Sequence, residues 1–88
     1  MKHLSDITEE KLEAGWVYKF KSDETLLNGD SDETIWSTLF YDKSMFIFII
    51  RIDVDIKAAS HDFESIMKEL ISYSNKYNLE LRSMKRNY

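Results

Sequence analysis

The clearest pattern of alternating side chains lies between Met45 and Ile56. One set of alternate positions is apolar throughout, namely Phe46, Phe48, Ile50, Ile52, Val54 and Ile56. The other set begins with Met45, Ile47 and Ile49 and ends with Arg51, Asp53 and Asp55. Because successive side chains of an extended chain point to opposite sides, the pattern predicts one central strand over residues 45–56. One end is expected to be covered on both faces, and the other to be wet on one face.

Two upstream segments have the same two-residue period. Residues 16–21 alternate Trp16, Tyr18 and Phe20 with Val17, Lys19 and Lys21, and residues 35–41 form a second apolar run. Residues 42–44 are few enough to connect that run directly to the central strand. The three segments therefore predict a three-stranded antiparallel meander.

Helical spacing appears on both sides of these strands. From Phe63 to Tyr77 apolar residues recur every three or four positions, which predicts an amphipathic helix over about residues 60–76, with Ser60 as N-cap and Asn78 as a left-handed end. Near the start, Thr8 and Gly15 bound a short predicted helix as N-cap and C′ residue. Residues 79–84 alternate again and predict a last short strand.

These elements predict a single α+β domain over residues 1–88. Its expected layout is a short N-terminal helix, a three-stranded antiparallel meander, a long amphipathic helix packed on one sheet face, and a short C-terminal strand. The chain has 88 residues and no cysteine, so its core must form without disulfides. The acidic first ten residues lack the apolar run of a secretory signal, and we expect a cytoplasmic protein.

A second apolar sheet face is the first indication of function. One helix of about 17 residues covers one face of a small sheet, and only the short N-terminal helix remains for the other. The residues expected on that other face are Trp36, Phe40, Met45, Ile47 and Ile49. An aromatic patch that stays uncovered is typical of a protein-binding surface.

Charge is distributed unevenly along the chain. The net charge is −4; residues 1–64 carry fourteen acids and seven bases, whereas residues 65–88 carry two acids and five bases. Five acids lie in the segment between the first two strands: Asp23, Glu24, Asp30, Asp32 and Glu33. Together with Trp36 and Phe40 they form the predicted protein-binding site, since a charged rim around an aromatic centre suits an interface. An ordinary solvated loop is the alternative interpretation of the acids.

Two other kinds of site are weaker hypotheses. Lys19 and Lys21 would form a nucleic-acid-binding surface with Arg82, Lys85 and Arg86 if the first and last strands are neighbours, with Tyr88 or Trp36 available for stacking. Asp53 and Asp55, with His61, Asp62 and Glu64 nearby in sequence, would hold the divalent cation of a hydrolase. Their simpler interpretation is a solvated strand end followed by helix-capping residues.

The combination favours binding over catalysis. We expect a small module that occupies another protein's surface, as inhibitors, antitoxins, immunity proteins and phage anti-defence proteins do, and that needs no cofactor or metal. The expected partner is a nuclease, a toxin, a defence complex or a second copy of the chain. No motif in the sequence identifies a family.

Overall fold

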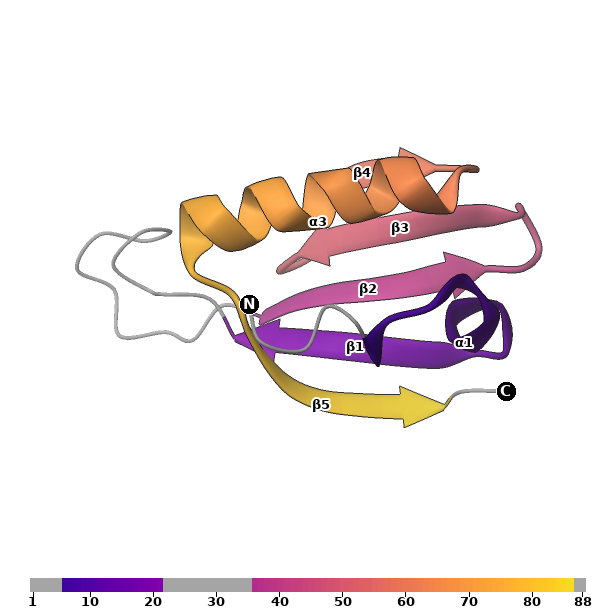
Figure 1. Cartoon of the computed structure of the whole chain (residues 1–88), viewed down its shortest axis with the longest axis horizontal. Helices are drawn as coiled ribbons and strands as arrows, with labels where there is room; N and C mark the ends of the chain where they lie inside the picture. Colours follow the sequence, from indigo (N-terminus) through magenta and orange to yellow (C-terminus); the bar gives the residue numbers. More distant parts are fainter. Residues whose placement is uncertain (1–5, 22–35, 87–88) are drawn as a thin grey trace.

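The computed structural model of the chain describes residues 6–21 and 36–86. Its elements are α1 (Glu9–Glu13), β1 (Trp16–Lys21), β2 (Trp36–Asp42), β3 (Ile47–Ile52), β4 (Asp55–Ser60), α3 (Phe63–Tyr77) and β5 (Glu80–Arg86). The five strands form one antiparallel sheet in the order β4-β3-β2-β1-β5 (Figure 1). The predicted α+β architecture is confirmed, with a helix packed on an antiparallel sheet and a C-terminal strand.

The segment predicted as one long central strand is a hairpin of two strands. β3 ends at Ile52, Asp53 and Val54 form the turn, and β4 runs back along β3 from Asp55. Asp53 takes a left-handed backbone conformation, with φ of 57°, which Asp tolerates better than most residues because its short side chain bonds locally. The prediction of a single strand over residues 45–56 was therefore wrong, and the meander has four strands.

Both helices of the described chain pack on the same side of the sheet. α3 contacts β3 and β4, while α1 contacts β1 and β2, and both lie in front of the sheet in Figure 1. One buried cluster joins them: Ile7, Leu12, Tyr18, Phe20, Leu39, Phe48, Ile50, Ile66, Leu70 and Leu79. The short helix was expected to cover part of the second sheet face. That expectation was wrong, because Ile7 and Leu12 extend the core that α3 begins.

The first four residues of the apolar set, Phe46, Phe48, Ile50 and Ile52, were expected to face the long helix, and three of them do. Phe48, Ile50 and Ile52 are buried, but Phe46 is 69% exposed in the turn between β2 and β3. Its φ of 56° places Phe46 in the left-handed region, which interrupts the alternation on which the prediction depended. Phe48 packs edge to face against Phe63 of α3, with ring centroids 5.8 Å apart.

Capping residues fix the helix ends. Thr8 caps α1 as predicted, since its Oγ1 accepts a hydrogen bond from the Lys11 amide at 3.2 Å. The N-cap of α3 is Asp62, whose Oδ2 accepts from the Ser65 amide at 3.0 Å, and the predicted cap Ser60 belongs to β4. Asn78 ends α3 with φ of 51°, the predicted left-handed stop.

Candidate interaction surface

The sheet face opposite the helices, called the open face below, carries the candidate site. Strand register and alternation assign to it Val17, Lys19, Lys21, Trp36, Thr38, Phe40, Asp42, Ile47, Ile49, Arg51, Ile56, Ala59, Glu80, Ser83 and Lys85. No helix among the described residues lies over this face. Antiparallel sheets often leave one face to solvent, but such faces are normally polar.

The centre of the open face is apolar. Phe40 of β2 lies directly opposite Ile49 of β3, and Ile47 follows at the start of the same strand. Ile49 is only 7% exposed and does not belong to the buried cluster under the helices. Trp36, at the start of β2, is 37% exposed and presents a large ring to solvent.

Cations surround this apolar centre. Lys19 and Lys21 come from β1, Arg51 from β3 and Lys85 from β5. The Nζ atom of Lys19 lies 4.8 Å from the centroid of the Trp36 ring, within the range of a cation–π interaction. The open face thus combines an aromatic and aliphatic centre with a rim in which four cations outnumber the two acids, Asp42 and Glu80.

Asp42, which follows Phe40 on this side of β2, is held within a turn. Its Oδ1 accepts hydrogen bonds from the hydroxyl of Ser44 at 2.6 Å and from the Ser44 amide at 3.0 Å. These hydrogen bonds, chiefly the one from the Ser44 hydroxyl, hold the pKa of Asp42 below its ordinary value. Because a lowered pKa keeps the carboxylate ionised, Asp42 remains one negative charge at the edge of the open face.

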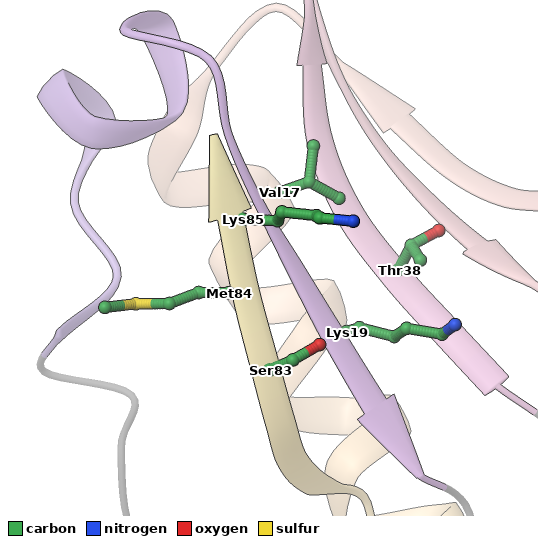
Figure 2. Close-up of a pocket in the computed structure, with 6 residues that line it drawn as sticks. All are labelled: Val17, Lys19, Thr38, Ser83, Met84 and Lys85. Carbon is green, nitrogen blue, oxygen red and sulfur yellow. The ribbon is translucent and has the colours of Figure 1, made fainter. Parts of the chain in front are cut away.

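A hollow of about 400 Å³ lies on the open face where β5, β1 and β2 run side by side. Its lining residues are Val17, Lys19, Thr38, Ser83, Met84 and Lys85. Figure 2 shows Lys19, Thr38, Ser83 and Lys85 on one side of the strands, with Met84 directed to the other side of β5. Two ammonium groups and two hydroxyls around Val17 suit an anionic group such as a carboxylate or a phosphate.

The structure places part of the predicted protein-binding site. Trp36 and Phe40 lie on the open face, as the sequence predicted, and Ile47 and Ile49 join them there. Met45, predicted for the same face, is in the turn after β2. The acidic residues of the site, Asp23, Glu24, Asp30, Asp32 and Glu33, lie outside the described residues.

The predicted basic surface required the first and last strands to be neighbours, and β1 does pair with β5. Lys19, Lys21 and Lys85 share the open face, but the two arginines are engaged elsewhere. Arg82 forms an ion pair with Glu80 at 3.4 Å, and the Nε atom of Arg86 donates to the Ala14 carbonyl at 3.1 Å. Three of the five predicted bases therefore form the surface. Tyr88 lies outside the described residues.

The predicted carboxylate cluster is dispersed. Asp53 is in the β3–β4 turn and Asp55 starts β4, so the two do not share one strand face as expected. The Nδ1 atom of His61 lies 2.7 Å from the Phe46 carbonyl, which accepts a hydrogen bond from it, and Asp62 caps α3. Among residues 6–21 and 36–86, no group of three His, Asp or Glu side chains is placed to hold a metal ion.

Sequence reasoning missed the hydroxyls of Thr38 and Ser83. Each is an ordinary strand residue by itself, and only the pairing of both with Lys19, one on β2 and the other on β5, brings them into the hollow. The alternation of residues 79–84 placed Ser83 on the same side as Leu79 and Leu81, and that indication was wrong. The β-bulge beside Arg82 moves Ser83 to the open face, opposite Lys19, and no local signal identifies either the bulge or the neighbouring strand.

Comparison with protein-family models, with curated proteins and with solved structures yields no match. The described helices include none with the length and apolar character needed to cross a membrane. The interpretation of the open face therefore depends on its own chemistry.

Proposed function

We propose that this protein is a binding module that acts by covering part of a partner protein's surface with its open face. One observation supports the proposal above all. α1 and α3 share one side of the sheet, so Trp36, Phe40 and Ile49 lie on a side without a described helix. Such an apolar centre within a charged rim matches the composition of protein interfaces, where aromatic residues and arginine are enriched.

The open face also has the residue types that dominate binding energy. Hot spots are enriched in Trp, Tyr and Arg and cluster near the centre of an interface. Trp36 and Arg51 lie on adjacent strands of this face, with Thr38 directly opposite Arg51. Burial of the remaining exposed part of Trp36 by a partner would add apolar contact at about 25 cal/mol per Å².

The sign of the rim specifies the partner's charge. The helix layer carries the acids Asp6, Glu9, Glu10, Glu13, Asp62, Glu64 and Glu69 against Lys11, Lys68 and Lys76, whereas lysine and arginine predominate on the open face. Charge complementarity raises association rates and suppresses wrong partners. The expected partner therefore presents an acidic surface with apolar residues at its centre. Inhibition of a nuclease, toxin or defence complex is one use of such a module.

Differential capture tests the proposal. The immobilised protein is exposed to lysate of the organism that encodes it, beside a Lys19→Glu, Lys85→Glu variant of the open face. The control variant carries Lys68→Glu and Lys76→Glu on α3, which makes the same change of charge on the other side. We expect a protein that wild type and control retain and the open-face variant loses, with all three folded by circular dichroism.

Two results would contradict the proposal. A partner retained equally by all three proteins binds elsewhere, and a partner lost only with the α3 substitutions assigns the contact to the helix layer. Light scattering on the purified protein tests the self-association alternative: a dimer that the open-face variant converts to monomer identifies the second copy as the partner.

Binding of single-stranded nucleic acid is a second candidate function. The observation that favours it is the β1–β5 pairing, which brings Lys19, Lys21 and Lys85 onto the face that also bears Trp36. The whole-chain charge of −4 opposes it, since it disfavours the approach of phosphates. Three phosphate contacts to a single strand predict a slope of log K against log salt of about −2. Titration with a dT20 oligonucleotide at several salt concentrations measures that slope.

A further inference from the structure

β5 is the last strand on one side of the sheet. Its inner edge pairs with β1, and no described element lies along its outer edge. In an edge strand, every second residue directs its backbone N–H and C=O groups away from the neighbouring strand. Six of the seven residues of β5 are exposed, and Leu81 is half-buried. This edge therefore presents backbone groups and side chains to an incoming chain.

The charge of β5 determines which chain can approach. Arg82, Lys85 and Arg86 stand against the single acid Glu80. Two copies of β5 placed side by side would bring like charges together, which is how natural edge strands avoid pairing with themselves. An acidic segment meets the opposite situation, because the net positive charge of β5 attracts its carboxylates.

Hollows flank β5 on both sheet faces. The hollow of the open face and a second one of about 280 Å³, lined by Asp6, Leu81, Arg82, Ser83 and Met84, share Ser83 and Met84. Figure 2 shows Ser83 and Lys85 directed toward one side of β5 and Met84 toward the other. Peptides that add to a sheet edge obtain affinity from backbone hydrogen bonds and specificity from recesses for alternate side chains. β5 has both features.

Regular pairing is available over the second half of β5. A β-bulge interrupts the register beside Arg82, since Lys19 pairs with Ser83 and Phe20 with Leu81. Ser83, Met84, Lys85 and Arg86 then pair in register with β1. An added strand can follow these four residues without meeting the bulge, and they are the residues nearest the hollow of the open face.

The opposite edge of the sheet lacks these properties. β4 carries one acid and one base, Asp55 and Lys57, so it has no charge preference. The Tyr73 hydroxyl of α3 donates a hydrogen bond to the Lys57 carbonyl at 3.2 Å, and a bulge interrupts the pairing of β4 with β3 near this residue. Neither hollow reaches β4. The two edges therefore differ, and β5 is the one suited to a ligand.

We infer that β5 is a docking edge for an extended acidic segment of the partner protein, which adds to the sheet as a sixth strand. The inference rests on the proposed function, since it assumes that the partner is a protein. Alternate acidic side chains of the segment reach Lys85 and Lys19 on the open face. The intervening side chains pack beside Met84 and Leu81, which favours apolar residues at those positions.

Peptide titration followed by NMR tests the inference on the full-length protein. The probe is the acetylated and amidated decapeptide (Glu-Val)5, which combines alternating acids with high strand propensity. Two matched peptides separate the contributions: (Glu-Val)5 with every backbone nitrogen methylated keeps the acids but lacks the N–H groups for pairing, and (Lys-Val)5 keeps the alternation but reverses the charge. The oligonucleotide dT10 supplies anionic phosphates in place of carboxylates.

The expected result has three parts. (Glu-Val)5 shifts the amide signals of Ser83, Met84, Lys85 and Arg86 and slows the hydrogen exchange of the alternate residues whose N–H groups face the outer edge, and neither matched peptide does so. Lys85→Glu weakens the binding at least tenfold, whereas Lys76→Glu on α3 changes it less than twofold. Raising the salt concentration weakens binding of the wild-type protein.

Each other result overturns the inference. Equal binding of the N-methylated peptide shows attraction by charge without strand pairing, and tighter binding of dT10 at the same residues assigns the edge to nucleic acid. Shifts confined to Phe40, Ile47 and Ile49 place the peptide on the open face without edge pairing. If no peptide binds while differential capture still identifies an open-face partner, the docking edge is wrong and the proposed function stands. Failure of capture counts against the proposed function itself.

Discussion

The ammonium nitrogen of Lys19 lies over the ring of Trp36, 4.8 Å from its centroid. The two residues are not directly opposite, because the register pairs Lys19 with Thr38 and Trp36 with Lys21. Lys19 therefore reaches diagonally across β1 and β2, a distance that long side chains on one sheet face can span. The contact holds an exposed aromatic ring in one orientation, which lowers the entropy that a partner must remove on binding.

We predict that this contact stabilises the fold measurably. Lys19→Gln removes the cation and should lower the free energy of unfolding by about 0.5–1 kcal/mol, the range for exposed cation–π pairs. Urea denaturation of Lys19→Gln, Trp36→Leu and the double variant forms a double-mutant cycle. Additive effects of the two substitutions would show that the ring and the ammonium group do not interact.

The two phenylalanines of the β2–β3 region should respond very differently to truncation. Phe48 is buried between Tyr41 and Phe63, so Phe48→Ala should cost about 3–5 kcal/mol. Phe46→Ala should change stability by less than about 0.5 kcal/mol, because its ring is exposed. Thermal and urea denaturation compare the pair. A large loss of stability in Phe46→Ala would show that Phe46 belongs to the core.

We predict that ionisation of Tyr18 lowers the stability of the fold at alkaline pH. The Tyr18 ring is buried and its hydroxyl donates a hydrogen bond to the Asp6 carbonyl at 3.2 Å. The pKa of Tyr18 is raised above the ordinary 10.0, mainly by burial and also by the charge of Asp6. The folded state therefore retains the proton that the unfolded chain releases. The contribution of Tyr18 to the free energy of unfolding is fully present below pH 10 and is lost as the pH rises through the raised pKa.

Tyr18→Phe is the matched variant for that prediction. It removes the ionisable group while keeping the ring, so its stability should fall less steeply above pH 10 than that of the wild type. Equilibrium urea denaturation between pH 8 and pH 11 measures both slopes. Parallel curves would assign the alkaline loss to other groups.

The turn at Asp53 should select residues by backbone conformation. The backbone of Asp53 has a φ of 57°. Asp53→Val therefore places a β-branched residue in the left-handed region and should lower the free energy of unfolding by about 1–2 kcal/mol. Asp53→Gly should be within about 0.5 kcal/mol of wild type, since glycine adopts this conformation readily. Asp55→Val is the control, because Asp55 lies in β4, where β-branched residues are favoured. Equal effects at both positions would contradict a turn at Asp53.

Local signals in the sequence determined most of the element types. Alternation identified β1, β2 and β5, helical spacing identified α3, and Thr8 and Asn78 marked helix ends by their own capping chemistry. The hairpin between β3 and β4 escaped this reasoning. Asp53 and Val54 are not a typical turn pair, and the alternation of apolar residues continues through them, so the period alone does not reveal the reversal.

The open face was predictable in part. Because side chains alternate along a strand, the sequence assigned Trp36 and Phe40 to one face and required a single long helix to leave one side uncovered. Its charge was not predictable, since Lys19 and Lys85 meet only through the pairing of the first strand with the last.

For β1, β2 and β3 the sequence by itself determined which residues lie on the same side, because that depends on the two-residue period of an extended backbone. The tertiary structure alone decided that α1 joins α3 on one sheet face and that β5 lies beside β1 at an edge. Both outcomes depend on contacts between segments distant in the chain, where burial of Ile7, Leu12 and Leu79 in the shared core selects the arrangement. That arrangement leaves the aromatic, basic face without a described helix.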